Sequence, residues 1–256
     1  MLVVDPSAAP QRMLSELLRN LGANEVFTAE STVGALKVAE QADPQIILTE
    51  LSGEALDGLH LSRLIRKSEL ACRRAPIIMV TGEATPRAIF GARDAGAHEF
   101  LRKPYTIRDL LRRLEAVACQ PRDWIEGIAY IGPDRRRFNS GDYQGPRKRR
   151  ADGVERPEKA RLLQSMKIVQ AALAAVEHDP AQAYRALRAQ AQDIHQIAIR
   201  AGDLKLAAAA DDLKAYLVAA ETRGLARPSV ASHAQTLWSL LPAEIQAEAK
   251  GDAAAA

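Results

Sequence analysis

Hydrophobic residues in the first 120 positions gather in five short runs that are rich in Val, Ile and Leu. Runs of this length, bounded by Gly, Pro or polar residues, are typical of buried β-strands. The stretches between them have apolar residues at helical spacing, as in Leu14, Leu18 and Leu21. The predicted strands are 1–5, 25–29, 45–50, 76–81 and 98–102, and the predicted helices are 10–22, 32–42, 58–69, 85–96 and 106–118.

This alternation of strand and helix predicts an α/β fold. The crossovers are expected to be right-handed, which gives a parallel sheet covered by helices on both faces. In such sheets, functional sites lie beyond the carboxyl ends of the strands. The residues that follow each predicted strand are therefore the first candidates for chemistry.

The second half of the chain has a different pattern. Residues 121–156 interrupt the alternation with Gly, Pro and two arginine clusters, which is typical of a linker. Asp179 and Asp203 are expected to cap helices, and Pro180 suits a first helical position. The predicted helices are 157–178, 180–201, 203–222 and 228–249. We therefore predict three parts: an α/β domain at 1–120, a basic linker at 121–156 and an α-helical bundle at 157–250.

Composition narrows the class of protein further. The net charge is +3, and the positive excess lies at 121–161, where 11 basic and 7 acidic residues give +4. Cys72 and Cys119 lack metal-type spacing, so we expect reduced thiols in a cytoplasmic protein. We see no signal peptide and no apolar run long enough to span a membrane. Motifs of nucleotide-binding, zinc-dependent and serine-hydrolase enzymes are missing, so we expect no enzyme.

Four polar side chains follow the predicted strands. Asp5 ends the first strand, Glu50 the third and Thr81 the fourth, and Lys103 follows the fifth. Carboxylates suit a hard cation such as Mg²⁺, whereas a hydroxyl and an ammonium suit phosphate oxygens. Together the four residues outline a phosphoryl site.

The motifs around these residues are LVVD at 2–5, IILTE at 46–50, IIMVTGEA at 77–84 and GAHEFLRKP at 96–104. In this respect the first 118 residues resemble the receiver domain of two-component response regulators, particularly the single-domain chemotaxis type. The resemblance implies a flavodoxin-like, five-stranded, doubly wound sheet. It also implies a phosphoacceptor position at Glu50, a metal-binding acid at Asp5, a switch hydroxyl at Thr81, a phosphate-pocket lysine at Lys103 and a rotating aromatic at Phe100.

The same resemblance implies partners. Receivers use the face formed by their fourth helix, fifth strand and fifth helix, which is 100–111 here. A histidine kinase, a phosphotransfer protein or an output protein is therefore expected to bind this face.

Two positions depart from the family pattern. A second acid normally follows the first strand, but Pro6 occupies that place, and the phosphoacceptor is normally Asp rather than Glu. Loss of a carboxylate weakens a Mg²⁺ site, so we expect a weak magnesium site at most and no other cofactor. The extra methylene moves the Glu50 carboxylate about 1.5 Å outward, which disfavours in-line transfer.

Three interpretations of Glu50 stay open. Its carboxylate mimics the phosphorylated state, or it merely neutralises Lys103, or it retains some phosphorylation. The first two predict an atypical response regulator that acts as a signalling adaptor independently of phosphorylation.

The linker suggests a second hypothesis. Positions 134–150 contain seven basic and two acidic residues, interleaved with aromatic ones. Arginine forks and aromatic rings suit phosphates and stacked bases, so nucleic acid or a cyclic dinucleotide is a candidate ligand. The alternative is a solvated charge run. The basic residues are Arg135, Arg136, Arg137, Arg147, Lys148, Arg149 and Arg150.

His195 suggests a third hypothesis. The helical run 194–217 loosely resembles the helix pair of histidine phosphotransfer domains, which implies a phosphohistidine at His195. Those domains carry Lys and Gly shortly after the histidine, whereas Ala198 and Ile199 stand here. A missing cation and a bulky Ile199 instead favour a histidine at the edge of the bundle with no phosphoryl role.

Overall fold

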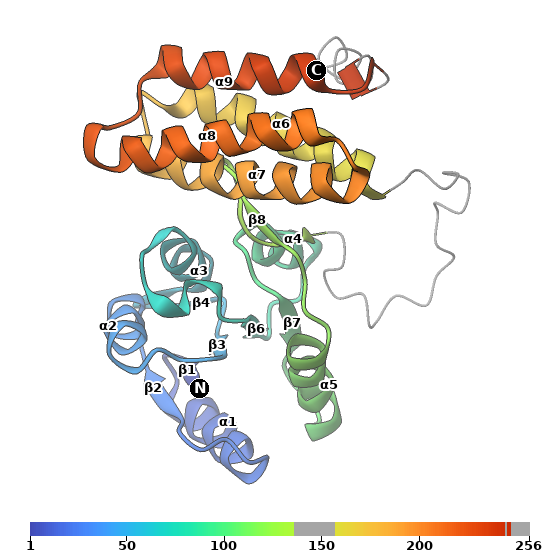
Figure 1. Cartoon of the computed structure of the whole chain (residues 1–256). Helices are drawn as coiled ribbons and strands as arrows, with labels where there is room; N and C mark the ends of the chain where they lie inside the picture. Colours follow the sequence, from blue (N-terminus) through green and yellow to red (C-terminus); the bar gives the residue numbers. More distant parts are fainter. Residues whose placement is uncertain (136–156, 244, 247–256) are drawn as a thin grey trace. The chain divides into compact units, whose positions relative to one another are not determined.

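A computed structural model of the chain describes residues 1–135, 157–243 and 245–246. They form two compact units, and each is described by itself (Figure 1). The first unit runs to Ile125 and continues from Tyr130, whereas the second contains Glu126–Ala129 and the helices from Pro157 onward. None of the helices in the described ranges is long and apolar enough to cross a bilayer.

The first unit is built on a five-stranded sheet with the order β2-β1-β3-β6-β7. Every neighbouring pair is parallel, with Val3 of β1 beside Leu48 of β3, for example. The predicted five-stranded, doubly wound parallel sheet is thus confirmed. The strands are β1 (Leu2–Val4), β2 (Phe27–Ala29), β3 (Ile47–Thr49), β6 (Ile77–Thr81) and β7 (Glu99–Arg102).

Helices cover both faces of this sheet. Val3 and Leu48 pack with α1 and α5, whereas their neighbours Leu2 and Ile47 pack with α2, α3 and α4. Burial on both faces explains why the strands read as continuous apolar runs. The helices are α1 (Ala8–Asn20), α2 (Thr32–Ala42), α3 (Gly58–Lys67), α4 (Pro86–Asp94) and α5 (Ile107–Cys119), with a 3₁₀ turn, η1, at Ala71–Arg74. A small hairpin of β4 (Ser52–Gly53) and β5 (Leu56–Asp57) joins β3 to α3.

A second hairpin stands where the composition predicts a linker. β8 (Trp124–Glu126) and β9 (Ile131–Pro133) pair within 121–156. The guanidinium groups of three arginines, on α3 and η1, lie 5.3, 5.4 and 5.9 Å from the centre of the Trp124 ring. Cation–π contacts of this kind stabilise the strand against the first unit. Residues 124–133 of the predicted linker thus form a hairpin, and positions 136–156 lie outside the described residues.

A buried polar pair lies in the same region. Arg66 of α3 is fully buried and donates hydrogen bonds to three backbone carbonyl oxygens. The Nδ1 atom of His98 accepts a hydrogen bond of 3.3 Å from the amide of Ile77. Burial, followed by the positive charges of Arg66 and Arg122, lowers the pKa of His98 to about 2. The folded protein therefore holds a neutral imidazole at this position.

Acid is expected to destabilise the first unit through His98. Below the ordinary pKa of 6.5, the unfolded chain binds a proton on this ring that the folded chain does not bind. The stabilisation is complete above pH 6.5 and falls by about 1.4 kcal/mol for each pH unit below it. Urea unfolding at several pH values measures this slope, with Trp124 fluorescence as the probe in a Trp238→Phe background.

His98→Asn is the matched control, because its side-chain oxygen keeps an acceptor for the Ile77 amide but does not titrate. Its free energy of unfolding should fall less steeply with acidification. Equal slopes in the two proteins would show that His98 does not contribute.

The second unit is helical, as predicted. Asp179 and Asp203 cap α7 and α8 by accepting hydrogen bonds from the amides of Gln182 and Leu206. The core contains many alanines, which allow close approach of the helices. The last helix ends earlier than predicted, because Pro242 disfavours helical backbone at the residue before it. The helices are α6 (Pro157–Ala175), α7 (Pro180–Ala201), α8 (Leu204–Arg223) and α9 (Arg227–Leu240).

Candidate functional site

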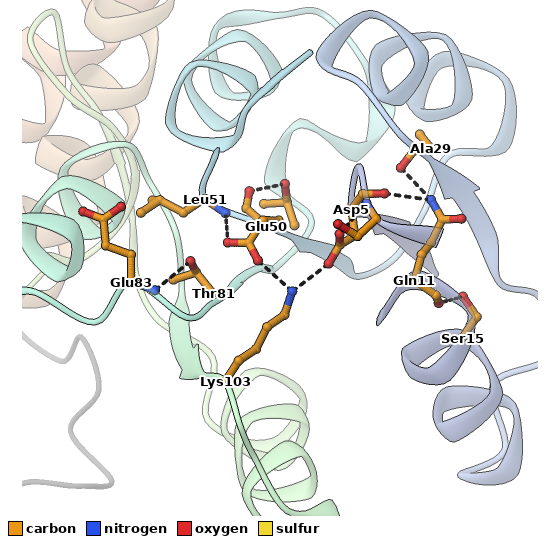
Figure 2. Close-up of polar contacts among 11 residues, drawn as sticks. Asp5, Gln11, Ser15, Ala29, Glu50, Leu51, Thr81, Glu83 and Lys103 are labelled. Atoms are coloured by element: carbon orange, nitrogen blue, oxygen red, sulfur yellow. Dashed lines mark hydrogen bonds and ion pairs between the residues drawn. The ribbon is translucent and has the colours of Figure 1, made fainter. Parts of the chain in front are cut away.

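The carboxyl edge of the sheet brings three of the predicted site residues into direct contact. Asp5 follows β1, Glu50 follows β3 and Lys103 follows β7. Parallel pairing places the ends of these strands at one edge, and the Lys103 side chain extends across it (Figure 2). Its Nζ atom lies 2.7 Å from Oδ2 of Asp5 and 2.6 Å from Oε2 of Glu50. One ammonium thus bridges two carboxylates.

The bridge is largely shielded from solvent. The side chains are 24% exposed at Lys103, 8% at Asp5 and 13% at Glu50. Burial disfavours the charged lysine, but the hydrogen bonds and charges of the two carboxylates outweigh it and raise the pKa of Lys103. The ammonium therefore stays charged across the physiological pH range.

Backbone amides complete the coordination of both acids. The second oxygen of Asp5 accepts a hydrogen bond of 2.9 Å from the amide of Ser7. The second oxygen of Glu50 accepts one of 2.7 Å from the amide of Leu51 (Figure 2). Each of the four carboxylate oxygens thus has a donor, and Lys103 serves as the cation for both acids. The single ammonium offsets one of the two negative charges, and the two amides hold the remaining oxygens.

Thr81 contacts Lys103 through the backbone, whereas Phe100 lies in the core, and neither side chain is part of the bridge. Thr81 ends β6, and its backbone oxygen accepts a hydrogen bond of 2.8 Å from the amide of Lys103. Its hydroxyl oxygen accepts one of 3.2 Å from the amide of Glu83, as Figure 2 shows. Phe100 is 4% exposed and packs in the core on the side of α2, α3 and α4.

Pro6 fills space beside the pocket. A Cβ atom placed on Gly53, in the β4–β5 hairpin, would lie 2.4 Å from Cγ of Pro6. The ring of Pro6 therefore packs directly over the glycine backbone. The described residues contain no group of three or more acids, histidines or cysteines arranged to hold a metal ion. Gly53 and the amides of Ser7 and Leu51 were not identifiable from the sequence, because backbone donors and packing partners leave no residue-type signal.

Most of the arginine run lies outside the described residues. Arg135 is described, and its guanidinium lies 3.0 Å from Asp94 of α4 and 4.5 Å from the centre of the Tyr130 ring. This arginine is thus engaged by the first unit itself. Anion binding stays a prediction for Arg136, Arg137, Arg147, Lys148, Arg149 and Arg150, which fall in the undescribed range 136–156.

His195 lies in the second unit, on α7. Its Nδ1 atom is 3.0 Å from Oδ1 of Asp211, which stands on the neighbouring helix α8. The same carboxylate oxygen is 2.6 Å from Nζ of Lys214. These partners could not be identified from residue types alone, because they come from a different helix.

Comparison with known proteins covers the first unit. Residues 1–115 match the response regulator receiver domain family. Chemotaxis protein CheY1 of Helicobacter pylori is 33% identical over 118 residues, which are 46% of this chain and 94% of the relative. Chemotaxis protein CheY-3 of Vibrio cholerae is 29% identical over 116 residues, 45% of this chain and 88% of the relative. The structure of chemotaxis protein CheY4 of Vibrio cholerae shares 29% identity, covers 45% of this chain and 95% of its own, and has a TM-score of 0.43.

Proposed function

Because this chain belongs to the response regulator receiver family through residues 1–115, we propose that it is an atypical response regulator that acts as a signalling adaptor without being phosphorylated. Receiver domains are signalling modules of two-component systems that interact with histidine kinases and with output proteins. The proposal concerns what this receiver does in place of phosphorylation.

The observation that carries the proposal is the bridge of Lys103 between Asp5 and Glu50. Phosphoryl transfer to a carboxylate needs a free oxygen as nucleophile and a cation that shields the incoming phosphoryl group. Here both oxygens of Glu50 accept hydrogen bonds, and the ammonium is shared with Asp5. The Glu50 carboxylate and the Lys103 ammonium therefore already bind each other.

Glu50 also bears on which state the receiver adopts. Its carboxylate bonds to Lys103 and to its own loop, and the Thr81 hydroxyl bonds to the amide of Glu83 instead. We infer that Glu50 holds the pocket in one fixed arrangement rather than reproducing the contacts of a phosphoryl group with Thr81. Partner proteins would then bind a receiver surface that does not change with phosphorylation.

The surface that partner proteins would bind lies at 100–111 and on the adjoining α4. Phe90 of α4 is 54% exposed, and Ile107 and Leu111 of α5 are 53% and 36% exposed. Exposed large apolar side chains are common at protein interfaces. This face is the one on which we expect a kinase, a phosphotransfer protein or an output protein to bind.

A magnesium test separates this adaptor from a working receiver. Addition of about 10 mM Mg²⁺ should leave the melting temperature of the full chain unchanged, because Lys103 occupies the place of the cation. Lys103→Met removes the ammonium and should gain a Mg²⁺-dependent rise, whereas the surface control Lys37→Met should behave like the wild type. A saturable rise in the wild type would contradict the proposal.

A further inference from the structure

The helical unit carries an arrangement of side chains that the receiver unit does not explain. His195 of α7 and Asp211 of α8 meet at 3.0 Å through Nδ1 and Oδ1. Lys214, one turn after Asp211, approaches the same oxygen at 2.6 Å. The three side chains form an imidazole–carboxylate–ammonium group across two packed helices.

The carboxylate fixes the chemistry of the imidazole. The hydrogen bond of Lys214, together with its charge and that of His195, lowers the pKa of Asp211, so this acid is ionised at neutral pH. An ionised carboxylate beside Nδ1 keeps a proton on that nitrogen, which leaves the lone pair on Nε2. No partner for Nε2 is found among the described parts of the chain. The free nitrogen is therefore the basic, nucleophilic one.

Solvent reaches this nitrogen. The His195 side chain is 25% exposed, and Asp211 is 52% exposed. Ile199, one helical turn beyond the histidine, is 51% exposed.

Lys214 acts through the carboxylate. Its Nζ atom lies 2.6 Å from the Asp211 oxygen that approaches Nδ1, so the ammonium is bound on that side of the ring. It keeps Asp211 ionised against Nδ1, which leaves Nε2 as the nitrogen that meets an incoming phosphoryl group.

We propose that His195 is a phosphoryl acceptor through Nε2, with Asp211 as the positioning residue and Lys214 as the cation that keeps Asp211 ionised. The donor is a compound or protein with a labile phosphoryl bond, either an acyl phosphate or a phosphoramidate. With phosphoramidate, the Nε2 lone pair attacks phosphorus while the bond from phosphorus to the amine breaks. Ammonia leaves with that electron pair, and the ring retains its Nδ1 proton against Asp211. This proposal does not depend on the state of Glu50.

The test is incubation of the full chain with potassium phosphoramidate, followed by intact mass and peptide mapping. The expected product is a single adduct on His195 that is stable in base and lost in acid, as phosphohistidine is. It should vanish in His195→Gln and persist in His178→Gln, since His178 is an exposed histidine on the same unit with no carboxylate partner in the described structure. No adduct on the wild type, or an adduct that survives His195→Gln, would overturn the proposal.

Asp211 is tested through the rate of labelling. Asp211→Asn should slow labelling by about tenfold or more, because the amide no longer holds the tautomer that frees Nε2. Asp211→Glu should restore part of the rate, whereas a purely structural role would not predict this rescue. Unchanged labelling in Asp211→Asn would remove Asp211 from the proposal. A base-labile adduct on Glu50 would instead count against the adaptor function and leave the His195 result intact.

Discussion

Replacing Lys103 with methionine is expected to lower the free energy of unfolding of the first unit by about 3 kcal/mol. The variant keeps the length and apolar stem of the side chain but removes the ammonium between Asp5 and Glu50. Two largely buried carboxylates then face each other without a shared cation, and an uncompensated buried charge is costly. Urea unfolding followed by Trp124 fluorescence, in a Trp238→Phe background, measures the loss.

A double variant separates the ion pair from packing. Lys103→Met combined with Glu50→Gln removes the uncompensated charge of Glu50, so its loss should be smaller than the sum of the two single losses. Lys37→Met, on the exposed surface of α2, controls for the change of lysine to methionine. Additive losses, or a Lys103→Met loss no larger than that of Lys37→Met, would mean that the bridge does not stabilise the fold.

Placing Asp at both positions that depart from the family pattern is expected to produce the largest functional change. The combined variant Pro6→Asp with Glu50→Asp should become labelled at residue 50 by acetyl phosphate in the presence of Mg²⁺. The shorter side chain withdraws the carboxylate by about one bond length, and the added acid provides a further oxygen ligand for the metal. Removal of the proline ring also opens the space over Gly53 in which that ligand must stand.

The single variants test whether both positions are needed. Glu50→Asp alone lacks the added acid, and Pro6→Asp alone keeps the longer side chain, so each should be labelled much less than the pair. Peptide mapping locates the adduct, and omission of Mg²⁺ should abolish it. Full labelling of either single variant would show that the other position does not limit the chemistry.

The sequence predicted the sheet of the first unit well, because strands buried on both faces leave continuous apolar runs. The same regularity placed Asp5, Glu50 and Lys103 at the strand ends, and a pair between Glu50 and Lys103 was expected. The contact between Lys103 and Asp5 was not predicted, nor were the hydrogen bonds from the amides of Ser7 and Leu51. Such contacts depend on how each loop turns after its strand, which residue types do not report.

The second half shows a different limit. Caps at Asp179 and Asp203 were predictable, since they act within a few residues. The hairpin of β8 and β9 was not, because its short strands contain glycine and proline and depend on arginines far away in the sequence. The partner of His195 was missed for the same reason, since Asp211 lies on another helix.

The most direct measurement is the reaction of the unmodified full chain with acetyl phosphate and Mg²⁺, followed by intact mass and base-lability mapping of the receiver unit. With the Glu50 oxygens held by Lys103 and the amide of Leu51, we predict no base-labile adduct on this unit. A stoichiometric, magnesium-dependent acyl phosphate at Glu50 would contradict the account.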